Sequence, residues 1–400
     1  MNKKNIGAIA VILIIVIATG TYYGALMHRQ LDYGSELETL LDTKFNEYCE
    51  NKQGFEEGNI AMKISSPKGD YFVSVGSDQT ITENTHYRIA SVTKTFTAAA
   101  ILLLNQEGLL QIDDKITDVI PNKDITYIPE TTDYNIPYKE EITIKQLIGH
   151  TAGVFDVTNS PIPENTSAPY SGMIYTEYIK ELEPEHTFSF DELVGVVASN
   201  QLSYFRPGTS YHYSNTGYSM LATIIERVSG LSYAEFIEQY LLEPNGLSDT
   251  TIPVSGTDKT LPSPYAEGYA WIDGEMLEVT LDNMSPHVAE GNIISTLNNI
   301  NKWISLLYSG EAGLNKDTIE IMTTPLTEEN QGYGLGTTIV EGLGYGHNGA
   351  HLGYLNIAMT DPETGVTVTI FAPIDFDNLG DEINYLYNLG REAKRTLGYN

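Results

Sequence analysis

The chain has 400 residues, with 53 acidic and 22 basic side chains and a formal net charge of −31. So acidic a chain offers no gathered lysine and arginine residues, which argues against binding to nucleic acid or charge-driven binding to anionic lipid. The hydrophobic fraction of 41% is ordinary for a folded globular protein and excludes disordered and fibrous classes. The single cysteine, Cys49, permits neither a disulfide within the chain nor a cysteine-based metal cluster.

Residues 1–30 contain a candidate membrane segment. Lys3 and Lys4 precede an uncharged apolar run over residues 6–27, which is long enough to span a bilayer about 30 Å thick. The positive flank is expected to keep the extreme N-terminus inside. Two interpretations stay open, a retained anchor and a signal peptide that is cleaved after small residues. Either one predicts that residues 31–400 lie outside the cytoplasm, at the cell membrane or secreted.

The next segments predict a helix, a hairpin and a second helix. A capping-box pattern near residue 35 opens an amphipathic helix. Two short strand-like runs, over residues 60–65 and 71–76, are joined by turn residues and predict a β-hairpin. The apolar run over residues 96–104 predicts a buried helix, and the pattern stays mainly helical from there to about residue 326.

Strand patterns return near the C-terminus. They cover residues 333–341, 354–360 and 366–372, and a helical pattern over residues 381–397 closes the chain. Strands near both ends with helices between them predict an α+β fold with one antiparallel sheet. We expect this sheet to use residues from about 58–90 and 330–373, and an inserted helical region to occupy about 105–325.

The first candidate for chemistry is Ser91 with Lys94, at the start of the predicted buried helix. A spacing of three places both side chains on one helix face. The helix N-terminus favours an anion, and a partly buried lysine releases its proton more easily, so the pair can make the serine nucleophilic. The spacing alone leaves a plain helix cap open, and Ser65 with Lys68 repeats it in a turn.

The second candidate is Tyr213 with Asn215, just before a predicted helix. Tyr213 can take a proton from serine only if a cation such as Lys94 stabilises its phenolate. Asn215 is expected to contact a substrate amide or to hold the lysine. Tyr354 and Asn356 repeat this spacing, so a structural tyrosine stays open.

The third candidate lies on a glycine-rich strand and comprises His347, Asn348, Gly349 and Ala350. Glycine there permits close approach of a ligand backbone. His347 is expected to donate to a substrate carboxylate or to support proton transfer, and the N–H of Ala350 to form an oxyanion hole with that of Ser91. A structural histidine stays open as well.

Order and context distinguish these candidates from their repeats, and together they resemble the penicillin-recognising serine hydrolases. This family includes class C β-lactamases, D-alanyl-D-alanine carboxypeptidases, D-aminopeptidases and related esterases. The resemblance runs from about Asn59 to Ala372 and rests on residues 88–94, 147–153, 206–208, 213–215 and 347–349 with Gly353 and Tyr354.

The resemblance implies a β-lactamase/transpeptidase-like domain over residues 31–400. Its antiparallel sheet would be flanked by helices, and the active site would lie between the sheet and an all-helical region. It also implies an acyl-serine route in which Ser91 attacks a carbonyl, Lys94 and Tyr213 relay its proton, and water releases the acyl group. Asn215 would place the substrate, and His150 would belong to a structural loop. No metal and no organic cofactor are implied.

The expected function is that of an exported serine hydrolase acting on a small molecule or peptide. A D-alanyl-D-alanine carboxypeptidase or a D-amino-acid peptidase fits best. His347 stands where class C β-lactamases usually carry lysine, which argues against true β-lactamase activity. An esterase, a weak β-lactamase and a penicillin-binding sensor that does not turn over remain alternatives, and the sequence does not indicate an oligomeric state.

Overall fold

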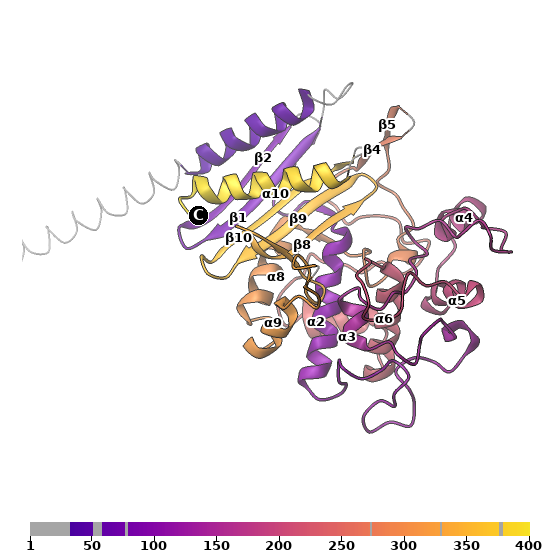
Figure 1. Ribbon diagram of the computed structural model, residues 1–400. Helices are drawn as coiled ribbons and strands as arrows, with labels where there is room; N and C mark the ends of the chain where they lie inside the picture. Colours follow the sequence, from indigo (N-terminus) through magenta and orange to yellow (C-terminus); the bar gives the residue numbers. More distant parts are fainter. Residues whose placement is uncertain (1–32, 51–57, 77–78, 273, 329, 376–378) are drawn as a thin grey trace, which may run out of the picture.

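A six-stranded antiparallel sheet organises the molecule (Figure 1). The computed structural model describes residues 33–50, 58–76, 79–272, 274–328, 330–375 and 379–400. The strand order is β2-β1-β10-β9-β8-β7. The strands are β1 (Asn59–Ser66), β2 (Gly69–Gly76), β7 (Thr338–Val340), β8 (Gly344–His351), β9 (Tyr354–Asp361) and β10 (Val366–Ala372).

The sheet confirms the predicted α+β class, since strands from both ends of the chain pair with each other. β1 pairs with β10, so that Met62 lies opposite Ile370. The predicted strand over residues 333–341 is mostly wrong, because only Thr338–Val340 pair as β7. Glycines at 334 and 336 interrupt the earlier part, and glycine weakens the interior of a strand.

Two helices cover the outer face of the sheet, one over residues 33–50 and the other α10 (Leu379–Thr396) (Figure 1). Their apolar sides bury Leu37, Leu41 and Leu386 against strand residues such as Ile357. Among the described residues no helix is long and apolar enough to cross a membrane. The candidate membrane segment over residues 6–27 lies outside the described residues.

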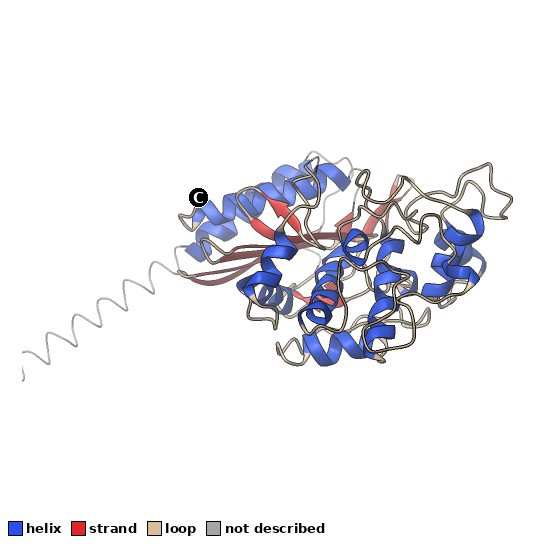
Figure 2. Cartoon of the chain, turned by 60° about the horizontal axis from the view of Figure 1, so that its bottom comes forward, coloured by secondary structure: helices blue, strands red, loops and turns tan. Residues whose placement is uncertain are grey.

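The inner face of the sheet meets a larger group of helices (Figure 2). Helix α8 (Leu297–Ser309) packs on β1, β9 and β10, and α2 (Thr93–Gln106) lies between the sheet and α6 (Asn215–Ser229). The ring of Phe96 stacks on Trp303 at 4.2 Å. Because α2 is buried almost all round, the uninterrupted apolar run that predicted it matches its position.

The remaining elements form the rest of the helical region and its connections. The α-helices are α3 (Ile144–Ile148), α4 (Tyr175–Leu182), α5 (Phe190–Asn200), α7 (Tyr233–Ile237) and α9 (Lys316–Thr323). The short helical turns are η1 (Ala90–Val92), η2 (Thr132–Tyr134), η3 (Glu238–Leu242) and η4 (Ser285–His287).

The region expected to be helical also contains short strands, which the prediction missed. β4 (Tyr269–Ile272) and β5 (Glu275–Glu278) form a hairpin beside β11 (Ile374–Asp375). β6 (Ile294–Thr296) pairs with β3 (His86–Arg88). Runs of three or four residues are too short for their alternation to be recognised, and their partners lie far away in the sequence.

Candidate active site

Ser91 lies in the short turn η1, at the point where β3 leads into α2. Ala90, directly before it, has a left-handed backbone with φ of 47°, which is strained for a residue with a Cβ atom. The residue that caps α2 is Val92, and no side chain caps this helix. The interpretation of Ser91 as a plain helix cap is therefore wrong, and its hydroxyl is free for other contacts.

Lys94 is the second residue of α2, three positions after Ser91, and its side chain is fully buried. Its ammonium group donates to Ser91 Oγ at 3.1 Å, to the Glu290 carbonyl oxygen at 2.9 Å and to Glu290 Oε2 at 3.1 Å. These three acceptors match the three protons of a charged lysine. Burial lowers the pKa of Lys94, and the charge of Glu290 opposes this shift.

Tyr213 approaches the same serine from the loop before α6. Its hydroxyl donates to Ser91 Oγ at 2.9 Å, and its ring centroid lies 4.7 Å from Lys94 Nζ. Burial raises the pKa of Tyr213 well above its usual value. The condition set for Tyr213 as a proton acceptor, a phenolate stabilised by Lys94, is therefore not met at rest, because burial and the nearby Glu290 carboxylate favour the neutral phenol.

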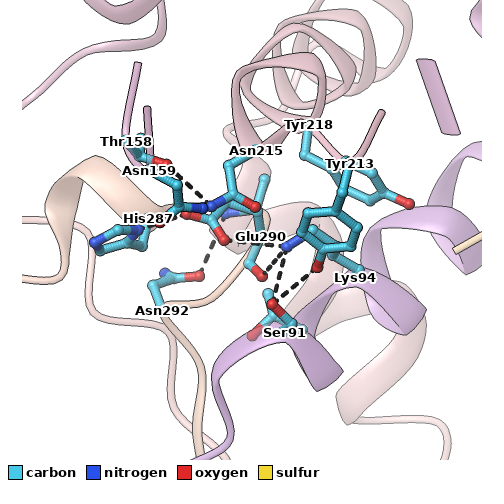
Figure 3. Close-up of polar contacts among 12 residues, drawn as sticks. Ser91, Lys94, Thr158, Asn159, Tyr213, Asn215, Tyr218, His287, Glu290 and Asn292 are labelled. Carbon is cyan, nitrogen blue, oxygen red and sulfur yellow. Dashed lines mark hydrogen bonds and ion pairs between the residues drawn. The ribbon is translucent and has the colours of Figure 1, made fainter. Parts of the chain in front are cut away.

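Glu290 and His287 complete the polar group around Lys94 (Figure 3). The Glu290 side chain is 3% exposed, and its Oε1 lies 2.5 Å from His287 Nδ1. Burial disfavours its charge, but Lys94 and His287 hold the pKa of Glu290 below its usual value. The sequence analysis missed both residues, because a single glutamate between Ala289 and Gly291 has no recognisable pattern.

Asn215, the first residue of α6, lies beside this group and makes no hydrogen bond to Lys94 among those found in the described residues. Its Nδ2 donates to Thr158 Oγ1 at 2.9 Å, and its backbone N–H donates to Asp156 at 3.2 Å. The buried Oδ1 finds no donor within the described part of the chain. The expectation that Asn215 holds the lysine is wrong, although the residue does line the cavity beside Ser91.

A directed chain of hydrogen bonds joins His150, Tyr333 and His347. The N–H of Ser214 donates to His150 Nδ1 at 3.1 Å, so the proton of the neutral ring sits on Nε2, which faces the Tyr333 hydroxyl at 3.2 Å. Tyr333 in turn lies 3.0 Å from His347 Nε2. His347 Nδ1 lies 2.6 Å from the Asn348 carbonyl oxygen, to which it must donate.

Both histidines of this hydrogen-bonded chain, His150 and His347, are neutral. Burial lowers the pKa of His347 to about 3 and that of His150 well below its usual value, and the charge of Lys94 adds to both shifts. The His150 ring also packs against Tyr213, with centroids 4.2 Å apart. His150 thus supports Tyr213 as part of the site's framework, which is consistent with the structural position expected for it.

The β8 residues are placed differently from the expectation. Both ring nitrogens of His347 are engaged, so it offers no N–H to a substrate carboxylate. A Cβ atom on Gly349 would lie 2.2 Å from the Ile89 carbonyl oxygen, so this glycine admits the protein's own backbone rather than that of a ligand. Asn348 Oδ1 accepts from Tyr387 on α10 at 3.1 Å.

A cavity of about 630 Å³ opens beside Ser91. Its size is that of small-molecule sites. Ala350 lines it together with Ser91, as an oxyanion hole made from their N–H groups requires. The described residues contain no group of histidine, cysteine, aspartate or glutamate side chains suited to a metal ion. Six of the predicted site residues line this cavity, namely Ser91, Tyr213, Asn215, His347, Asn348 and Ala350.

Comparison with known proteins places these features in a family. The family model described as Beta-lactamase matches residues 69–389. A penicillin-binding protein of Bacillus subtilis (strain 168) is 30% identical over 190 residues, which cover 47% of this chain and 35% of the relative. The chain thus spans only about a third of the length of that relative.

Two solved structures share the fold. A D-stereospecific amidohydrolase from Streptomyces sp. is 25% identical with a TM-score of 0.66, and the match covers 80% of this chain and 90% of the other. D-amino acid amidase from Ochrobactrum anthropi SV3, complexed with D-phenylalanine, is 20% identical with a TM-score of 0.71 over 92% and 100% of the two chains. These matches confirm the resemblance to penicillin-recognising serine hydrolases.

Proposed function

This chain belongs to the Beta-lactamase family and is a serine hydrolase, and we propose that it cleaves amides of D-amino acids through an acyl-Ser91 intermediate. One observation carries the proposal. Lys94 and Tyr213 both donate to Ser91 Oγ, at 3.1 and 2.9 Å, at the wall of a cavity large enough for a small substrate. A serine held between two proton-transfer groups is an activated nucleophile.

In the acylation step, Lys94 in its neutral form accepts the hydroxyl proton while Ser91 Oγ bonds to the substrate carbonyl carbon. The N–H groups of Ser91 and Ala350 stabilise the oxyanion. Tyr213, which is protonated at rest, gives its hydroxyl proton to the leaving nitrogen as the C–N bond breaks and regains a proton from Lys94, so the amine departs neutral and Lys94 is neutral again. Water then attacks the acyl-serine, one proton returns to Ser91, and the acid is released. Asn215 lines the cavity that holds the substrate during both steps.

Two observations support an amide that lacks a carboxylate beyond the scissile bond. The structural neighbours named above are a D-stereospecific amidohydrolase and a D-amino acid amidase. In addition, His347 uses Nδ1 on the Asn348 carbonyl oxygen and Nε2 on Tyr333. A D-alanyl-D-alanine carboxypeptidase needs a donor for the terminal carboxylate of its substrate, and His347 does not supply one. The penicillin-binding relative keeps this activity as a second candidate.

The test compares D-phenylalaninamide, L-phenylalaninamide and a D-alanyl-D-alanine peptide on the full-length protein in detergent, with Ser91→Ala alongside. We expect faster turnover of the D-amide than of the other two and none by the variant. Equal rates in wild type and Ser91→Ala would refute the proposal. Faster release of D-alanine than of ammonia would instead select the carboxypeptidase.

We further propose that the apolar run over residues 6–27 places the hydrolase at the outer side of a cell membrane. The uncharged run and its preceding lysines support this. After expression in a bacterial host, the protein should remain in the membrane pellet after carbonate extraction and be degraded by protease added outside spheroplasts. Protection from the protease in intact spheroplasts would contradict the location.

A further inference from the structure

We propose that Glu290 is a positioning residue that sets the protonation state of Lys94, and that His287 holds the Glu290 carboxylate in place for this role. The inference rests on the proposed function in one respect, the use of Ser91 as a nucleophile. Glu290 lies outside every motif that the sequence offers.

The contacts of Glu290 are those of a dedicated counter-ion. Oε2 faces Lys94 Nζ at 3.1 Å, while Oε1 faces His287 Nδ1 at 2.5 Å, so each oxygen has one partner. The backbone carbonyl of Glu290 also accepts from Lys94, at 2.9 Å. Glu290 therefore holds the ammonium group of Lys94 through two contacts, one from its side chain and one from its backbone.

The backbone around Glu290 is held in a strained form. Ala289 has φ of 75°, a left-handed conformation that residues with a Cβ atom rarely adopt. The Ala289 carbonyl oxygen accepts from Thr97 on α2 at 2.5 Å, and its N–H donates to Asn292 Oδ1 at 3.3 Å. The helix that carries Lys94 therefore also fixes the loop that carries Glu290.

The surroundings leave Glu290 as the anion in direct contact with the lysine. Asp156 adds a weaker attraction, and its carboxylate accepts from Thr158 and from the N–H of Asn215. Burial raises the pKa values of the nearby tyrosines, which are Tyr213, Tyr218 and Tyr233, so these phenols are neutral. Burial also lowers the pKa values of His150 and His347, so both imidazoles are neutral. The titratable groups that face the pair are Asp156, His150, Tyr213, Tyr218, Tyr233, His287 and His347.

A direct consequence follows for the reaction. Lys94 must lose one proton before it can accept that of Ser91, and a buried carboxylate at 3.1 Å favours the charged lysine. Removing the negative charge while keeping the shape of the side chain should therefore allow Lys94 to deprotonate at lower pH. An opposite charge at this range shifts a pKa by about 1–3 units.

The experiment measures the rate at which a fluorophosphonate labels Ser91 in the full-length protein between pH 4 and 10, in wild type and Glu290→Gln. The probe needs no knowledge of the natural substrate. We expect the acid limb of the rate profile to move to lower pH by about 1–3 units in the variant. Below the wild-type limb, Glu290→Gln should then label about tenfold faster or more.

Glu226→Gln is the matched control, because Glu226 is a partly buried carboxylate on α6 whose partner is the Tyr233 N–H. Its acid limb should coincide with that of wild type. His287→Ala should shift the limb in the same direction as Glu290→Gln but by less, and it replaces that variant if Glu290→Gln does not fold.

Each outcome decides the matter. A uniform loss of labelling by folded Glu290→Gln, with the limb unmoved, would mean that Glu290 is merely structural and overturn the proposal. An unmoved limb in His287→Ala beside a shifted one in Glu290→Gln would overturn the role of His287. Wild type that fails to label at any pH would refute the proposed function as well as this inference, whereas labelling without turnover of the D-amide would refute only the proposed substrate.

Discussion

The layer on the outer face of the sheet and the cleft beside Ser91 bury different kinds of side chain, while the rest of the inner face packs on an apolar core that includes Phe96 and Trp303. On the outer face, α10 and the helix over residues 33–50 bury leucine and isoleucine side chains against the strands. On the inner face, beside Ser91, the buried groups include a lysine, a glutamate and two histidines, each with assigned donors and acceptors.

The difference teaches where this fold can tolerate change. An apolar layer is stabilised by the apolar surface area that it buries, which several kinds of side chain can supply. Such a layer therefore constrains the volume of each side chain more than the residue type. A buried polar group must find its partner or cost free energy, so the cleft constrains each residue individually. Substitutions on the outer face should therefore affect stability alone, whereas those in the cleft remove specific partners and should affect stability, the reaction or its pH range.

The largest expected effect is that of Ser91→Ala. Without the nucleophile, turnover should fall by about 10⁴-fold or more, while the melting temperature changes little. Intact-mass spectrometry after exposure to a fluorophosphonate should show one added group in wild type and none in the variant. Ser65→Ala is the matched control, because Ser65 has the same spacing to a lysine but binds Asn301 in the structure. Loss of labelling in that control as well would contradict the assignment.

Leu386→Ala tests the outer face. Leu386 on α10 is 2% exposed, and removing its side chain should lower the free energy of unfolding by about 3 kcal/mol through lost burial and a new cavity. Urea unfolding measures this change. The turnover number of the folded variant should equal that of wild type, and a tenfold fall would show that the outer layer contributes to the site.

Tyr333→Phe tests the directed chain in the cleft. The variant leaves His150 Nε2–H without its acceptor and His347 Nε2 without its donor, both buried, so the free energy of unfolding should fall by about 2 kcal/mol. Differential scanning calorimetry checks the loss. Tyr308→Phe removes a buried hydroxyl with the single partner Thr337 and should cost about half as much. Equal losses in the two variants would mean that the hydrogen-bonded chain through Tyr333 contributes no more to stability than a single buried hydrogen bond.

The smallest effect is expected at the ion pair of Asp361 with Lys394, between β9 and α10, whose atoms lie 2.6 Å apart. Burial disfavours the carboxylate, but the hydrogen bond from Lys394 holds the pKa of Asp361 below its usual value. A lowered folded pKa contributes stability above the unfolded pKa of about 4, and this contribution is lost as the pH falls through the folded value.

Asp361→Asn should accordingly be about 1 kcal/mol less stable than wild type at pH 7. The difference should shrink below about pH 4, where the unfolded carboxyl becomes protonated. Urea unfolding at a series of pH values measures it. A difference that stays constant down to the lowest pH at which both proteins fold would exclude the ionic contribution.

Local patterns were sufficient for much of the fold and for part of the site. Alternation and turn residues predicted the hairpin that became β1 and β2, and an apolar run predicted α2 with Ser91 and Lys94 at its start. These features depend on neighbours in the chain. The short strands β3 and β6 were missed, because their pairing joins residues about two hundred positions apart.

The hydrogen-bond partners of the reactive groups could be identified only from the tertiary structure. Glu290 lies 196 residues beyond Lys94, and nothing in its own neighbourhood distinguishes it from a surface glutamate. The sequence around His347 predicts a donor to a substrate carboxylate or a proton-transfer group, because nothing in it shows that Tyr333 engages Nε2 of this histidine. Whether a donor is free depends on what packs against it, and that is decided by long-range contacts.

The sequence by itself determined the fold class, the family and the residues able to carry the chemistry, because periodicity and motif order are properties of the chain. The tertiary structure alone decided the charge of Lys94, the neutral form of Tyr213 and the direction of the His150, Tyr333 and His347 chain. Protonation follows from burial and from the nearest charges, and both arise only when distant segments are packed together.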